Sequence, residues 1–168
     1  MRHLLLLRHA EAIHPSGCKD HDRPLTKTGR LAARHMGDVL ARKQLHLDLA
    51  LASDAQRTRE TLELALAEFR QSPKIILDPQ LYHAERNDLM EVVRQLPDEA
   101  QDVLIVGHNP SVAEFGLYLA DGANEEALRR MAYSVPPGAL AIFEISAPEW
   151  SDLRWSSAKL NLFLTPGD

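Results

Sequence analysis

Short apolar runs alternate with longer amphipathic stretches along this chain, and this alternation is typical of α/β layering. The run at residues 3–8 carries four consecutive leucines, as expected for a strand that is covered on both faces. Further strands are expected at residues 47–52, 74–77, 102–106, 139–145 and 155–164. Apolar positions at helical spacing predict helices at residues 26–43, 53–69, 86–96, 111–120 and 124–131.

A polar loop at residues 11–24 separates the first predicted strand from the first predicted helix. Thr26 is expected to cap that helix, and Ser53 or Asp54 to cap the next one. No internal repeat, low-complexity block or linker divides the sequence, so we expect one domain over residues 1–168. The order of elements predicts a three-layer α/β/α sandwich, in which helices cover both faces of an open, mostly parallel sheet.

Composition narrows the class of protein. Hydrophobic residues make up 45% of the chain and charged residues 26%, which is ordinary for a globular protein. The formal net charge of −5 gives no reason to expect nucleic acid or an anionic membrane as a partner. The one cysteine, Cys18, cannot form an internal disulfide and indicates a reducing compartment. Because the apolar run at residues 4–7 is too short for a signal peptide, we expect a cytoplasmic protein.

Polar clusters follow three of the predicted strands. Arg8 and His9 come directly after the first strand, Arg57 lies shortly after the second, and His108 follows the strand at residues 102–106. Ligands of such sheets bind at the carboxyl edge, where parallel strands end. We therefore expect two histidines and two arginines to converge at one edge, an arrangement suited to a dianionic phosphoryl group.

Histidine can accept a phosphoryl group because its neutral imidazole has a free lone pair near pH 7. Neighbouring arginines disfavour the imidazolium and so keep that lone pair available. The same guanidinium groups neutralise the charge on the phosphoryl oxygens during transfer. We therefore expect no cofactor and no metal ion, and no histidine spacing in the chain indicates a zinc site.

Three motifs at these positions resemble the histidine phosphatase superfamily, also called the phosphoglycerate mutase-like family. They are residues 7–11 (LRHAE), 53–61 (SDAQRTRET) and 106–109 (VGHN). The short chain and the segment at residues 23–26 (RPLT), followed by Gly29, resemble the SixA branch of phosphohistidine phosphatases. The resemblance extends from Met1 to about Ala120.

The resemblance implies a role for each matched residue. His9 is expected to be the nucleophile, and Arg8 and Arg57 the arginines that clamp the phosphate. His108 is expected to contact the phosphoryl group and stabilise the transition state. Arg23 corresponds to a further substrate-binding arginine of the SixA branch, although a simple loop charge is an equally good interpretation.

The sequence also departs from the family pattern. Ala10 follows His9 where glycine is commoner, and Thr58 follows Arg57 where a small alanine is usual. Many members use a carboxylate as general acid, which the SixA branch lacks. Glu85 lies in the corresponding stretch, but a carboxylate favoured at the start of a helix is the better interpretation of this residue. Asp20, like other acidic residues of the loop at 11–24, is interpreted as solvated.

The residues predict a metal-independent phosphatase that forms a phosphohistidine intermediate, and the resemblance to the SixA branch implies that it dephosphorylates phosphohistidine on a partner protein. The absence of a firm general acid favours a P–N bond as the substrate, because imidazole leaves more easily than an alkoxide. Two alternatives stay open: a phosphomonoesterase of the same fold that acts on a small phosphate ester, and a phosphoprotein-binding module without turnover. A mutase is disfavoured because the chain is short.

Overall fold

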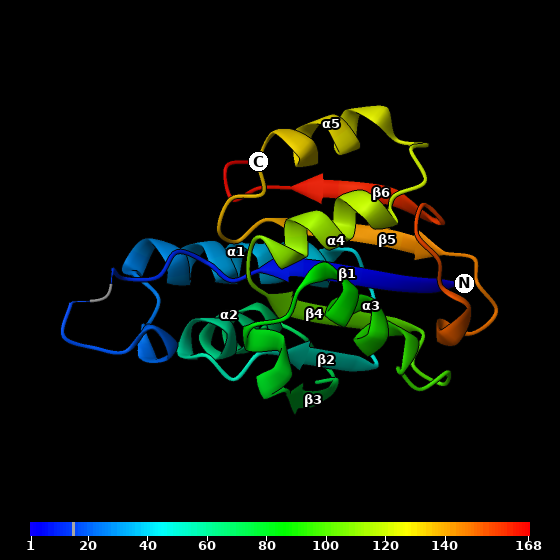
Figure 1. Cartoon of the computed structure of the whole chain (residues 1–168). Coiled ribbons are helices and arrows are strands. Elements are labelled where there is room, and N and C mark those ends of the chain that lie inside the picture. Colours follow the sequence, from blue (N-terminus) through cyan, green and yellow to red (C-terminus); the bar gives the residue numbers. More distant parts are fainter. Residues whose placement is uncertain (15) are drawn as a thin grey trace.

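A single mixed sheet forms the centre of the molecule (Figure 1). The computed structural model describes residues 1–14 and 16–168. Within these residues the strand order is β3-β2-β4-β1-β5-β6. The strands are β1 Arg2–Arg8, β2 Leu49–Ala52, β3 Lys74–Leu77, β4 Asp102–Gly107, β5 Leu140–Ile145 and β6 Ala158–Leu164. The first four pair in parallel, and β5 runs antiparallel to both of its neighbours, so the predicted mostly parallel sheet is confirmed.

Helices cover both faces of this sheet, as predicted. They are α1 Lys27–Arg42, α2 Gln56–Leu66, α3 Arg86–Arg94, α4 Ser111–Leu119 and α5 Glu125–Tyr133. Successive leucines of β1 point to opposite faces. Leu4 and Leu6 belong to the apolar cluster that includes α3, α4 and α5, whereas Leu5 and Leu7 belong to the cluster that includes α1 and α2. The four leucines are therefore buried because each face of the strand has its own helical layer.

The described helices are all too short or too polar to cross a lipid bilayer.

The start of α1 agrees with the sequence analysis, but the start of α2 does not. The Thr26 hydroxyl accepts a hydrogen bond from the backbone N–H of Gly29 and caps α1. The N-cap of α2 is Ala55, which has no side-chain oxygen, so the prediction of Ser53 or Asp54 as the cap is wrong. The Ser53 hydroxyl is fully buried and bonded elsewhere. Among the other predicted ends, the largest shifts are at the end of α2, which is Leu66, and at the start of β6, which is Ala158.

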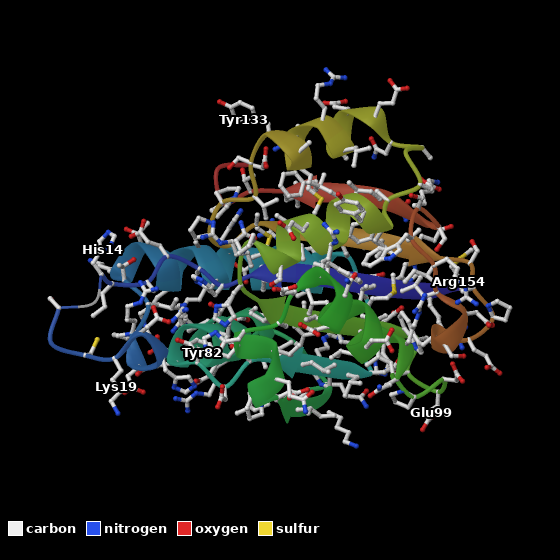
Figure 2. The ribbon with its side chains drawn as sticks, viewed as in Figure 1. His14, Lys19, Tyr82, Glu99, Tyr133 and Arg154 are labelled. Carbon is white, nitrogen blue, oxygen red and sulfur yellow. The ribbon has the colours of Figure 1, made fainter. Side chains whose placement is uncertain are left out.

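The parallel register decides which residues meet at the carboxyl edge of the sheet. In the pairing of β1 with β4, Arg8 lies opposite Gly107. The residues that follow, His9 and His108, therefore leave neighbouring strands at the same height. Figure 2 places His14, Lys19 and Tyr82 toward this side of the molecule and Glu99 and Arg154 toward the other.

Candidate active site

His9 emerges from the end of β1 with its proton in a defined position. Its Nδ1 lies 2.8 Å from the carbonyl oxygen of Ala10, and its Nε2 lies 3.3 Å from the Nε of Arg57. A carbonyl oxygen can only accept a hydrogen bond, and a guanidinium N–H can only donate one. The proton of the neutral ring is therefore on Nδ1, and the lone pair is on Nε2.

Burial keeps this ring neutral. His9 is only 8% exposed, and burial lowers its pKa from 6.5 to about 4. The positive charges of Arg57 and Arg8 also lower that pKa, whereas the hydrogen bond to Ala10 raises it. The ring is thus neutral, with its lone pair available, across the physiological pH range.

Arg57 lies in the first turn of α2 and already holds an anionic group. Its Nη1 donates to the backbone oxygen of Asp20 at 2.8 Å, and its Nη2 lies 3.1 Å from the Asp20 carboxylate. Arg23 contacts the same carboxylate through its Nε at 3.0 Å, and the Tyr82 hydroxyl donates to it as well. The interpretation of Asp20 as a solvated loop residue is therefore wrong. The short 3₁₀ turn Asp20–Asp22 carries this residue to the arginines.

The contacts of Asp20 show what the cluster favours. The hydrogen bond from Tyr82, with the charges of Arg57 and Arg23, lowers the pKa of Asp20 to about 2. Its carboxylate is therefore ionised at neutral pH, although its side chain is 52% exposed. Oxygen atoms of a phosphoryl group have the same requirements as this carboxylate, namely negative charge and several N–H donors.

Arg8 approaches the same place from the end of β1. One of its terminal nitrogens donates to the carbonyl oxygen of Val135 at 2.9 Å, and Asn109 donates to that oxygen at 2.9 Å. Burial and the charge of Arg57 lower the pKa of Arg8. Its Nε is buried and has no partner among residues 1–14 and 16–168, so part of its donor capacity is unused.

His108 follows β4, and its ring centroid lies 5.3 Å from that of His9. Burial lowers its pKa to about 3, with smaller contributions from His9 and Arg57. Its Nε2 lies 2.6 Å from the buried Ser53 hydroxyl. Tyr82 packs its ring edgewise against His108 at 5.4 Å, which gives the pocket an aromatic wall.

A pocket of about 680 Å³ joins these groups. Five of the residues predicted from the sequence line it, and they are Arg8, His9, Arg23, Arg57 and His108. The remaining residues that line it are Glu11, Ala12, Ile13, His14, Asp20, Thr26, Tyr82, His83, Asn109 and Pro137. Groups from five separate segments of the chain therefore surround one space that is rich in cationic donors.

Glu85 is not brought into this pocket. It is exposed at the N-cap of α3, where its carboxylate accepts a hydrogen bond from the backbone of Asp88 and the Asp88 carboxylate accepts one in return. It lines an adjacent hollow that also contacts Tyr82 and His108. The interpretation of Glu85 as a helix-start carboxylate is thus confirmed, and its use as a general acid stays a prediction.

Sequence reasoning missed four residues of the site: Asp20, Ser53, Thr58 and Tyr82. Ser53 and Thr58 lie inside the second motif, so their position was known. The contact of Ser53 with His108, to which Thr58 is joined through Ser53, depends on how β2 and β4 pair. Asp20 precedes Arg23 by three residues, and that spacing was a usable signal for their ion pair. No sequence signal indicates Tyr82.

Known proteins resemble this chain over almost its whole length. An uncharacterized protein of Mycobacterium leprae is 30% identical over 165 residues, which is 95% of this chain and 99% of that protein. A solved structure from Nakamurella multipartitia, described as a candidate phosphohistidine phosphatase SixA, has 31% identity and a TM-score of 0.85 over 98% of this chain and 96% of its own. Another candidate SixA, from Agrobacterium tumefaciens, has 25% identity and a TM-score of 0.83 over 98% of both chains.

The sequence profile of one family covers half of the chain. It is the histidine phosphatase superfamily (branch 1), and it matches residues 4–87. The matched segment contains His9, which follows β1, and Arg57, which lies in the first turn of α2. From this match, and from the geometry of the pocket, we conclude that the chain belongs to the histidine phosphatase superfamily.

Proposed function

We propose that the protein is a phosphatase that removes the phosphoryl group from a phosphohistidine side chain of a partner protein, through a covalent intermediate on His9. One observation carries this proposal. The Nε2 atom of His9 has its lone pair free of a proton and lies beside Arg57, in a pocket whose cationic groups already hold an anion. Nucleophile and anion site are thus in contact.

The reaction proceeds in two displacements. In the first, Nε2 of His9 attacks phosphorus, the P–N bond of the substrate breaks, and the substrate imidazole leaves with the bonding electrons and takes up a proton. In the second, water attacks phosphorus, the bond from phosphorus to Nε2 breaks, and inorganic phosphate is released. The guanidinium groups of Arg8, Arg23 and Arg57 balance the charge of the phosphoryl oxygens in both steps, in place of a divalent ion.

The carboxylates near the pocket support a substrate with a P–N bond. An alkoxide leaving group gains about 10²–10⁴-fold from a positioned acid. The Asp20 carboxyl, with a pKa of about 2, carries no proton to give at neutral pH. The Glu85 carboxylate serves the capping box of α3. The names of the two similar SixA structures point the same way.

Transfer of label from a ³²P-phosphohistidine protein tests the intermediate. The wild-type protein should acquire a phosphate that is labile to acid and stable to alkali, and His9→Ala should acquire none. His14→Ala is the matched control, because His14 is an exposed histidine that lines the same pocket. Tight binding of phosphate without any transfer of label would support the binding module instead.

Comparison of substrates tests the bond that is cleaved. We expect kcat/KM for the phosphohistidine protein to exceed that for every member of a panel of phosphate monoesters by at least about tenfold, or about 1.4 kcal/mol. A monoester that reacts as well as the phosphohistidine protein would contradict the proposed substrate and support a small-molecule phosphomonoesterase.

A further inference from the structure

Two buried hydroxyl groups, those of Ser53 and Thr58, form a hydrogen-bonded row that ends at His108. Ser53 and Thr58 are both fully buried. The Ser53 Oγ lies 2.6 Å from Nε2 of His108 and 2.7 Å from Oγ1 of Thr58. The Thr58 Oγ1 also lies 2.9 Å from two backbone carbonyl oxygens, those of Ser53 and Ala55. Thr58 is the residue at which the second motif departs from the family pattern.

The protons in this row can be counted. Carbonyl oxygens only accept hydrogen bonds, so the Thr58 hydroxyl must direct its single proton toward them. The contact between Thr58 and Ser53 must then use the Ser53 proton. Ser53 has no second proton, so the proton between Ser53 and His108 belongs to Nε2 of the ring. Any other arrangement leaves two lone pairs facing each other within 2.9 Å in a buried place.

The other ring nitrogen of His108 is the one left for the pocket. Within residues 1–14 and 16–168, Nδ1 has no hydrogen-bond partner, and it is not among the atoms sealed from solvent without one. His108 itself lines the pocket beside His9. The lone pair on Nδ1 is therefore free to take up a proton when an anion binds, while Nε2 keeps its bond to Ser53.

We propose that Thr58 is a positioning residue, which turns the Ser53 hydroxyl into a hydrogen-bond acceptor and thereby holds His108 with its proton on Nε2 and its Nδ1 toward the phosphoryl group. With Ser53 as an acceptor, both N–H groups of the protonated ring have a partner: Ser53 for Nε2 and a phosphoryl oxygen for Nδ1. The inference rests on the proposed function, because His108 acts only if the pocket transfers a phosphoryl group.

Thr58→Val tests this role with little change in side-chain volume. Without the threonine oxygen, the Ser53 proton is released and can be donated to Nε2 of His108. We therefore expect the ring to change tautomer, from a proton on Nε2 in the wild-type protein to a proton on Nδ1 in Thr58→Val. Long-range ¹H–¹⁵N NMR of the free protein reads the tautomer directly, with His108→Gln to assign the signals. Thr58→Ser keeps the hydroxyl and should keep the wild-type tautomer.

Kinetics on the best substrate of the wild-type protein give the second measurement. Because a preorganised hydrogen-bond donor to the developing charge contributes about 10²–10³-fold, Thr58→Val should lower kcat by at least about tenfold while KM changes little. Thr61→Val is the matched control, since its buried hydroxyl lies one turn further along α2 and bonds the backbone of Arg57 and Ala10 rather than Ser53. It should keep the His108 tautomer.

The outcomes separate this inference from the proposed function. A Thr58→Val protein that folds, keeps the proton on Nε2 and keeps its kcat would overturn the role of Thr58 while leaving the phosphatase intact. A wild-type protein in which His108 already has its proton on Nδ1 would also overturn the role of Thr58. Failure of the wild-type protein to take up label or release phosphate would instead refute the proposed function, and the tautomer measurement would still stand.

Discussion

The carboxyl ends of β1 and β4 lie at equivalent positions in the sheet, but the histidines that follow them differ in hydrogen bonding. The two strands are parallel neighbours in register, and each is followed by a histidine that is 8% exposed. Burial lowers the pKa of both rings, to about 4 for His9 and about 3 for His108. Yet the proton of the neutral His9 ring is on Nδ1, so that Nε2 has a free lone pair. In His108 the hydroxyl groups of Ser53 and Thr58 place the proton on Nε2 instead.

The difference shows that the sheet determines where the two rings lie, whereas α2 determines which ring nitrogen has the proton. Two successive residues of α2 make the distinction. Arg57 donates to Nε2 of His9, and Thr58 joins the hydroxyl row that reaches Nε2 of His108. The first turn of one helix, which contacts His9 through Arg57 and reaches His108 through Thr58 and Ser53, can therefore favour opposite tautomers in two histidines of equal exposure.

The largest expected effect separates the two histidines by function. His9→Gln removes the nucleophile and should lower turnover by at least about 10⁴-fold, with no phosphoenzyme. His108→Gln removes a hydrogen-bond donor to the phosphoryl group and should lower turnover by about 10²-fold. Steady-state kinetics, with rapid quenching to capture the labelled protein, measures both.

The amount of label provides the control for that comparison. His108→Gln should still acquire label, and more slowly than the wild-type protein. Label on His9→Gln together with none on His108→Gln would reverse the roles of the two strand ends.

An intermediate effect concerns acid stability and tests what the two rings share. Below pH 6.5 the histidines of the unfolded chain take up protons, while His9 and His108 in the native protein stay neutral until their pKa values of about 4 and 3. The unfolded state then binds more protons, so the free energy of unfolding falls as pH is lowered from about 6.5 toward about 4. Each ring contributes up to about 1.4 kcal/mol per pH unit.

Urea unfolding across this pH range measures the slope. Each single variant, His9→Gln or His108→Gln, should remove a similar part of it, because the rings are equally buried. The pKa of His21 is raised by Asp54, so its contribution to stability changes mainly above pH 6.5, outside this range, and His21 should be left unchanged in every variant. An unchanged slope in the double variant would show that the two rings are not the source.

The smallest effect is expected outside both strand ends, at Glu85. Because its carboxylate caps α3, Glu85→Gln should change kcat/KM for the phosphohistidine protein by less than about twofold and lower stability by about 0.5–1 kcal/mol. Asp88→Asn, which breaks the same capping box from the other side, is the control and should behave alike. Near-complete loss of activity in Glu85→Gln alone would mean that the two histidines need a carboxylic acid to complete the reaction.

Much of the site could be predicted from the sequence because its logic is local. Four leucines before Arg8 indicate a buried strand. The rule that parallel strands end at one edge of the sheet then predicts that His9, Arg57 and His108 lie close together. The family motifs then added Arg23, which lines the same pocket.

The tertiary structure alone decided the hydrogen-bond partners. Whether Asp20 is solvated or rests on Arg57, and whether Ser53 caps α2 or bonds His108, depends on side-chain directions across segments that are distant in sequence. Periodicity and motifs report which residues are buried and where strands end, but they carry no information on the direction of a single proton. The direction of a proton depends on which acceptor lies within about 3 Å of its donor. In this site the packing of α2 against the sheet determines which acceptor that is.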